Sequence, residues 1–228
     1  MLSSGNTAVN ITDTIWQVGG DGLSAAGDGA VYLAAFGTAA ALIDAGCGHG
    51  HAKIISNIKK CISPETKIDY LFLTHCHYDH TGGADRLRRQ FGCTLVAHEQ
   101  DAAFLESGDS DVTAASWYND ALAPFTVDHK VKGAEEIFRI GTGTIKALHA
   151  PGHSPGSMVL LTESHGQNVL FGQDVHGPLH PSLLSNRGDY IASLTMLLGL
   201  EADILCEGHF GIYRGHDKVR KFIESFIL

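Results

Sequence analysis

Apolar residues in the first third of the chain come in short runs separated by glycine-rich turns. Three of these runs, Ile11–Val18, Ala30–Phe36 and Ala39–Asp44, predict strands that pair as an antiparallel meander. From His51 to Cys61 the isoleucines have the spacing of a helix, and the run Ile68–Leu73 predicts a buried strand. This part of the chain is therefore expected to alternate between strands and helices.

The pattern is less regular in the middle of the chain. A helix is predicted over Gly83–Gln90 and a short strand over Thr94–Ala97. Between His98 and Asp128 the periodicity fades. The segment Asp109–Ala123 mixes small and polar residues with two aromatic ones, which fits a surface loop or lid and equally a short helix.

Strand-like runs return in the second half and imply a second sheet. They are bounded by Gly, Pro or polar turn residues and cover Glu136–Ile140, Thr144–His149, Met158–Thr162 and Asn168–Phe171. Residues 191–198 predict a helix, Asp203–Cys206 a short strand, and Val219–Phe226 a closing amphipathic helix. No linker or repeat divides the sequence, so we expect one domain over residues 1–228, with two related halves packed sheet on sheet.

Composition and charge narrow the function classes. Hydrophobic residues make up 44 % of the 228 residues and charged residues 18 %, which excludes a disordered chain. The net charge of −9 argues against nucleic acid or an anionic membrane as a partner. The 14 histidines are an excess for this length, and imidazole is the commonest metal ligand in proteins.

The expected location is the cytoplasm. The five cysteines form no CxxC pair and no disulfide-scaffold pattern, so a reducing compartment is favoured. The first ten residues lack the basic and apolar regions of a signal peptide, and the longest apolar run, Tyr190–Leu200, is too short for the roughly 20 residues that span a bilayer. No membrane partner is expected, and the oligomeric state is left open.

The most informative stretch is Thr74-His75-Cys76-His77-Tyr78-Asp79-His80, directly after the predicted buried strand. On an extended strand end alternate residues point the same way, so His75 and His77 can bind one ion together. A turn after them can bring Asp79 and His80 to a second position close by. Imidazole nitrogens and carboxylate oxygens suit zinc, manganese or iron.

Two ligands from one loop do not complete a metal site, so distant residues should add more. Three candidates each follow a predicted strand: His153 in a Pro/Gly turn, Asp174 after Gly172-Gln173, and His209 in Glu207-Gly208-His209. The C-terminal ends of strands are the usual place for a site on a scaffold of sheets and helices. We therefore expect these residues to meet the loop of residues 75–80.

The HxHxDH pattern of residues 75–80, followed in order by His153, Asp174 and His209, resembles the metallo-β-lactamase-fold hydrolase superfamily. The resemblance implies an αββα sandwich of two mixed β-sheets with helices outside. It also implies one metal on His75, His77 and His153, a second on Asp79, His80 and His209, and Asp174 between them. Asp44, in Ile43-Asp44-Ala45-Gly46, would support the metal loop.

By the same resemblance the protein is a binuclear metallohydrolase, nearest to glyoxalase II-like thioesterases and lactonases. A metal-bridging hydroxide would attack the carbonyl of a small thioester, ester or lactone, and Asp79 would be the catalytic proton shuttle. Two divalent ions are implied, zinc first, with iron or manganese as alternatives. Two other readings stay open: an iron enzyme like the persulfide dioxygenases, and a non-catalytic, metal-stabilised binding protein.

Overall fold

The strand-forming runs of the first half build a seven-stranded sheet in a computed structural model that describes residues 7–172 and 174–227. Strands β1 to β4 are antiparallel, and β4 to β7 are parallel. In order across the sheet the strands are β1 (Val9–Thr12), β2 (Ile15–Gly19), β3 (Val31–Phe36), β4 (Ala39–Ile43), β5 (Lys67–Phe72), β6 (Thr94–His98) and β7 (His129–Val131). Parallel neighbours need long crossovers, which here contain α1 (His51–Cys61), α2 (Tyr78–Thr81), α3 (Ala84–Phe91) and α4 (Glu99–Ser107).

The second half of the chain builds a six-stranded sheet. Its strands, across the sheet from one edge, are β13 (Ile212–Arg214), β12 (Ile204–Cys206), β11 (Gln167–Phe171), β10 (Met158–Ser164), β9 (Gly143–His149) and β8 (Glu135–Ile140). Only β11 and β12 are parallel neighbours, and the connection between them contains the 3-10 turn Pro181–Leu183 and helix α5 (Arg187–Leu198). Helix α6 (His216–Glu224) follows β13.

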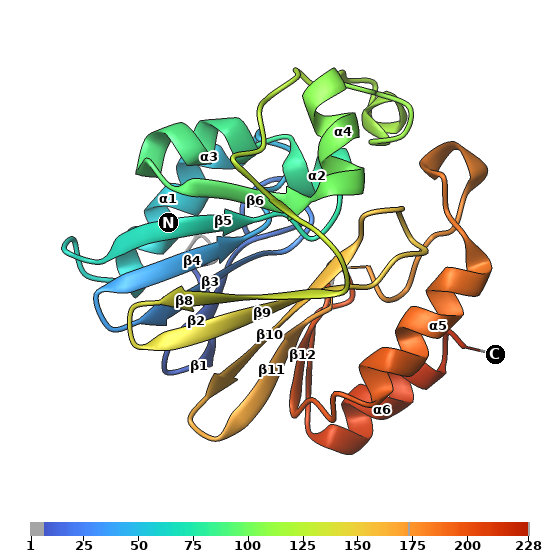
Figure 1. The fold of residues 1–228 in the computed structure, drawn as a ribbon. Helices are drawn as coiled ribbons and strands as arrows, with labels where there is room; N and C mark the ends of the chain where they lie inside the picture. The colour runs from blue at the N-terminus through green and yellow to red at the C-terminus, as the bar shows by residue number, and fades with distance from the viewer. Residues whose placement is uncertain (1–6, 173, 228) are drawn as a thin grey trace.

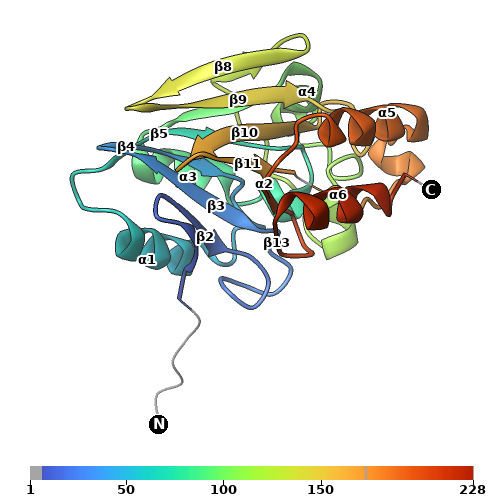
Figure 2. The same ribbon diagram turned by 90° about the horizontal axis from the view of Figure 1, so that it is seen from below.

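The two sheets pack face to face with helices on both outer sides, as the two views in Figures 1 and 2 show. Helices α1, α3 and α4 cover the first sheet, and α5 and α6 cover the second. Aromatic rings fill the space between the sheets: Phe72 meets Phe138 edge to face at 4.9 Å, and Tyr32 lies 5.5 Å from Phe171. The predicted αββα sandwich is confirmed.

Burial explains why the strand pattern was readable. Every residue of β3 and β4 is buried, because one face of these strands meets the second sheet and the other lies under α1. Strands that are buried on both faces appear in the sequence as continuous apolar runs. In the described ranges, 7–172 and 174–227, no helix has both the length and the apolar character needed to cross a membrane.

Several elements differ from the sequence prediction. The run Ile11–Val18 is two strands, because the chain reverses at Asp13 and Thr14 between β1 and β2. Residues 98–128 contain the unpredicted helix α4 and a 3-10 turn over Ala115–Tyr118, within the segment where a lid or a short helix was expected. Strands β7 and β13 and the short helix α2 were also not predicted.

Two stacked imidazoles join the ends of β6 and β9. The rings of His98 and His149 are 3.9 Å apart and nearly parallel. Burial, with the neighbouring His149, lowers the pKa of His98 from 6.5 to about 4. The unfolded chain protonates His98 at a higher pH than the folded chain does. The contribution of neutral His98 to the unfolding free energy is therefore fully present above pH 6.5 and is lost as the pH falls toward 4.

His98→Asn should therefore make unfolding less sensitive to acid. Asparagine retains an acceptor for the start of α4, where His98 accepts a hydrogen bond from the Gln100 N–H. Between pH 7 and pH 4.5 the variant should lose about 2 kcal/mol less unfolding free energy than the parent chain, measured by urea denaturation in the same metal state. His165→Asn, at an exposed histidine, is the matched control. Equal losses in the His98 variant and the parent would contradict the prediction.

Candidate metal centre

The loop after β5 changes from extended to helical backbone at His77. That residue has φ −68° and ψ 145°, and the short helix α2 begins at the next residue. His75 and His77 precede this helix, whereas Asp79 and His80 lie in its turn. The start of α2 thus separates the motif into two pairs of side chains. Residues 74–76 form a bend rather than the extended strand end that the sequence predicts.

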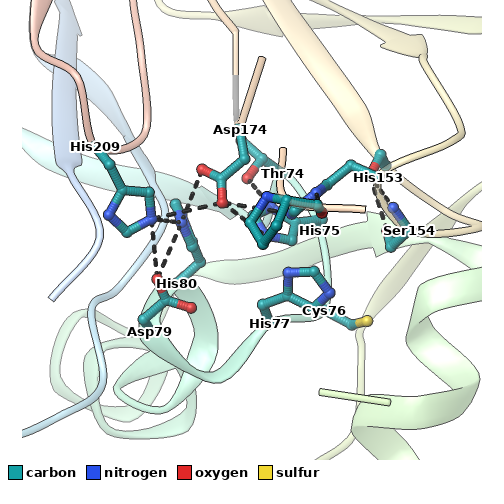
Figure 3. Close-up of polar contacts among 12 residues, drawn as sticks. Thr74, His75, Cys76, His77, Asp79, His80, His153, Ser154, Asp174 and His209 are labelled. Carbon is teal, nitrogen blue, oxygen red and sulfur yellow. Dashed lines mark hydrogen bonds and ion pairs between the residues drawn. The ribbon is translucent and has the colours of Figure 1, made fainter. Parts of the chain in front are cut away.

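The fold brings the seven predicted ligands together in two adjoining groups (Figure 3). Within each group the candidate ligand atoms lie within 4.8 Å of one another, and the groups are His75, His77, His153 and Asp174, and Asp79, His80 and His209. The carboxylate of Asp174 lies between them. One of its oxygens is 3.4 Å from Nε2 of His153 and 3.5 Å from Nε2 of His209, and the other is 3.3 Å from Nε2 of His80.

Unpartnered nitrogen atoms show that the first group fits a metal ion. The Nε2 atoms of His75, His77 and His153 are buried and have no hydrogen-bond partner among the described residues. Buried polar atoms are nearly always paired, because leaving one unpaired costs about 1–3 kcal/mol. Three such atoms beside one carboxylate form a donor set that suits zinc, iron or manganese.

The two groups differ in their affinity for protons. Burial and the neighbouring imidazoles lower the pKa of His77 to about 3 and hold that of His75 well below its usual range, so both rings are neutral and offer a lone pair. Burial also opposes protonation of His80 and His209, but the surrounding carboxylates outweigh it. They raise the pKa of His209 to about 10 and that of His80 well above normal. An ion bound by the second group would displace protons.

Asp44 supports the metal-binding loop through hydrogen bonds. Its carboxylate accepts hydrogen bonds from the backbone N–H and the hydroxyl of Thr74 and from Nδ1 of His80, each at 2.8 Å. Asp44 has φ +62°, a left-handed conformation that aspartate tolerates better than most residues. The bond to Nδ1 fixes the tautomer of His80 and directs Nε2 into the site.

Asp44→Ala should weaken metal binding at the second group by about 10–100-fold, the usual effect of removing the partner of a ligating histidine. Titration of the metal-free protein with zinc, followed by calorimetry, measures the loss. Asp13→Ala, at an exposed turn, should leave both affinities unchanged. A normal zinc titration of a folded Asp44 variant would show that His80 needs no such support.

Two buried carboxylates that the sequence did not single out connect the site loops. Asp101, on α4, accepts hydrogen bonds from the Cys76 N–H at 2.8 Å, the Gly156 N–H at 2.6 Å and the Ser154 hydroxyl at 2.5 Å. It thereby ties the loop of residues 75–80 to the loop of His153. No motif pointed to Asp101, because its partners are far away in the sequence.

Glu207 stabilises the loop that contains His209 in a similar way, through hydrogen bonds. This fully buried side chain accepts hydrogen bonds from the N–H groups of His209 and Phe210 at 2.7 and 2.8 Å, and from Nδ1 of His176 at 2.8 Å. It fixes the turn that presents His209. Its position at a strand end, two residues before a predicted ligand, was a signal that could have revealed it.

A cavity of about 240 Å³ opens beside the two groups. Its lining includes His77, His153 and Asp174 of the ligand groups, together with Trp117 and Leu183. His176 also lines it.

Three other side chains near the site have separate roles. The Tyr78 hydroxyl donates to Asp120 at 2.6 Å, and the Tyr190 hydroxyl donates to the carbonyl of Val175. His180 is exposed and packs edge to face against Trp117. Of Tyr78, His176, His180 and Tyr190, His176 is the one that lines the cavity.

Comparison with known proteins agrees with this geometry. The family model of the metallo-beta-lactamase superfamily matches residues 25–209. The chain belongs to that superfamily. The relatives it resembles include hydrolases and thioesterases, and together with the two groups of histidine and aspartate side chains they support a metallohydrolase.

Superfamily relatives differ in how much of their length the chain covers. It is 32 % identical to the hydroxyacylglutathione hydrolase GloC of Haemophilus influenzae over 76 % of this chain and 81 % of that protein. It is 27 % identical to the lactamase-like protein aptB of Emericella nidulans over 85 % of this chain and 55 % of that protein. Identity to the acyl-coenzyme A thioesterase MBLAC2 of Gallus gallus is also 27 %, over 68 % of this chain and 60 % of that protein.

Solved structures of the superfamily match nearly the whole chain. The Rm3 metallo-beta-lactamase superposes with a TM-score of 0.79 at 19 % identity, covering 97 % of this chain and 91 % of that one. BJP-1, a subclass B3 metallo-beta-lactamase of Bradyrhizobium japonicum, has a TM-score of 0.76 at 24 % identity, covering 98 % and 92 %. At these identities the likeness concerns the fold.

Proposed function

We propose that this protein hydrolyses a thioester, ester or lactone with the aid of two divalent metal ions. The observation that carries the proposal is the pair of adjoining ligand groups around Asp174, five of whose seven side chains line one cavity. The names of relatives that hydrolyse hydroxyacylglutathione or acyl-coenzyme A support a carbonyl substrate with a sulfur leaving group. Zinc is the proposed metal, since the ligands are nitrogen and oxygen atoms and zinc binds such sites more tightly than iron or manganese.

His75, His77 and His153 would hold one ion and Asp79, His80 and His209 the other, with Asp174 reaching both. When bound, the two ions would supply a water nucleophile at neutral pH and polarise the substrate carbonyl. Hydrolysis adds this water to the carbonyl carbon and breaks the bond to sulfur or oxygen. The leaving group then needs a proton.

Asp79 is the residue that we propose as the carrier of this proton. Its Oδ2 atom is 3.0 Å from Nε2 of His209, and the side chain lines the cavity. Tyr118, also in the cavity wall, interacts with this carboxylate, and burial together with Asp79 raises the pKa of the tyrosine. Tyr118 therefore remains a hydrogen-bond donor and directs the Asp79 carboxylate toward the substrate.

Elemental analysis of the purified protein, followed by a substrate panel, tests the proposal. We expect two equivalents of metal and turnover of S-acyl thioesters or lactones, but no turnover of phosphodiesters. Metal-stripped protein is the control and should regain activity with zinc. Tight metal without turnover would indicate a non-catalytic binding protein, and a single iron with oxygen uptake would indicate a dioxygenase. Either result would overturn the proposal.

A further inference from the structure

Large apolar side chains gather in the open around the mouth of the cavity. Six are exposed in the described part of the chain, and four of these lie on three loops beside the site: Trp117, Tyr118, Leu184 and Phe210. We call these four the apolar rim. Trp117 and Tyr118 line the cavity directly, Leu184 follows the lining residue Leu183, and the ring of Phe210 lies 4.5 Å from that of His176 in the wall.

Backbone conformation, a hydrogen bond and a ring contact fix the positions of three of the rim residues. Leu184 has φ +54°, in the left-handed region, where the turn that begins at Pro181 ends. Phe210 is held through its N–H, which donates to the buried Glu207. Trp117 lies on the 3-10 turn and packs edge to face against His180 across the mouth, with 5.4 Å between the rings. Keeping apolar surface in water costs about 25 cal/mol per Å², so a gathered patch marks a binding surface.

The cavity itself is too small for a whole substrate. Its volume of about 240 Å³ lies below the roughly 300–1,000 Å³ that typically encloses a small-molecule ligand. The reacting carbonyl and its nearest carbon atoms therefore fill the cavity, and the remainder of the substrate lies over the rim.

The charges of the lining indicate what kind of substrate fits. No lysine or arginine lines the cavity among the described residues, whereas Asp79 and Asp174 do. An anionic carrier such as glutathione or coenzyme A would find no lysine or arginine there, and the charge of two bound divalent ions would be shared with the two carboxylates.

We propose that the substrate is an uncharged thioester, ester or lactone whose acyl group carries an apolar chain of medium length, and that Trp117, Leu184 and Phe210 select it. This inference rests on the hydrolase function proposed above. It assigns substrate selection to the rim and the reaction to the metal centre. Experiments can therefore contradict the substrate class and the hydrolase function separately.

The test uses zinc-loaded protein and a series of S-acyl-N-acetylcysteamine thioesters from acetyl to decanoyl. Burying one CH₂ group contributes about 0.8 kcal/mol, so kcat/KM should rise by at least about 100-fold from acetyl to octanoyl. Trp117→Ala should lower kcat/KM at least tenfold more for the octanoyl thioester than for the acetyl thioester. Ile137→Ala, at an exposed apolar residue on β8, is the matched control and should change neither.

Binding of a non-hydrolysable thioether, S-octyl-N-acetylcysteamine, supplies a readout independent of turnover. Calorimetry should show at least tenfold weaker binding to the Trp117 and Phe210 alanine variants than to the Ile137 variant. Flat chain-length dependence, equal loss for acetyl and octanoyl substrates, preference for S-lactoylglutathione, or a rim buried in a dimer that Trp117→Ala dissociates would overturn the inference. If no thioester, ester or lactone were hydrolysed but the thioether bound as expected, the proposed hydrolase function would be wrong and the proposed role of the rim would be retained.

Discussion

Purified His77→Ala protein is expected to contain about half the metal of the parent and to have lost turnover by much more than 100-fold. The imidazole of His77 is buried, its Nε2 atom has no partner among the described residues, and its ring lies 4.5 Å from the rings of both His75 and His153. Removing even a residue that only orients a metal ligand costs about 10–100-fold, so loss of the ligand itself should cost more. Elemental analysis and thioester hydrolysis measure the two effects.

The exposed-histidine variant His165→Asn is the control and should retain both metal and activity. His77→Gln supplies a second variant in case the alanine protein folds poorly. If either His77 variant were folded and kept full metal content and rate, the assignment of the first ligand group would be wrong.

Asp101→Ala is expected to lower the unfolding free energy by about 3 kcal/mol, the largest stability loss that we predict. Removal of this carboxylate leaves the N–H groups of Cys76 and Gly156 and the hydroxyl of Ser154 without their buried acceptor, and each unsatisfied group costs about 1–3 kcal/mol, part of which relaxation recovers. Urea denaturation at neutral pH measures the loss. Zinc affinity should fall as well, because the loops of the first ligand group are no longer tied together.

Asp111→Ala, at an exposed acid in the same part of the chain, should change stability by less than about 0.5 kcal/mol. Asp101→Asn keeps the side-chain volume, but its amide accepts fewer hydrogen bonds than a carboxylate. Its loss of unfolding free energy should therefore lie between those of Asp101→Ala and Asp111→Ala. A loss below 1 kcal/mol for Asp101→Ala would mean that the loops keep their positions without this connection.

Elements with strong apolar periodicity were predictable from sequence, and elements without it were not. Helix α1 was predicted with its observed bounds, because its isoleucines pack under the first sheet while lysines end it in water. Helix α4 was missed because its buried apolar residues are only Ala102 and Leu105, with Phe104 partly buried beside them, and its third buried residue is the charged Asp101. The turn at Asp13 and Thr14 was missed because it contains neither glycine nor proline.

The candidate ligands could be found for a related reason. All of them follow strands, so the spacing of the motif and the order of strand ends were visible along the chain. Asp101 and Glu207 act instead on backbone N–H groups, which every residue except proline has, and no residue type marks such a partner. The apolar rim was equally hidden, because exposure of Trp117, Leu184 and Phe210 follows from tertiary packing alone.

Each ligand group draws its side chains from both sheets. His75 and His77 follow β5 in the first sheet, whereas His153 and Asp174 follow strands of the second. An ion held there would act as a cross-link that the unfolded chain lacks, and at 100 times its dissociation constant it would add about 2.7 kcal/mol to the folded state. Resistance to heat and proteolysis would then follow the supply of that ion, so a cell starved of it would lose the protein itself along with the activity.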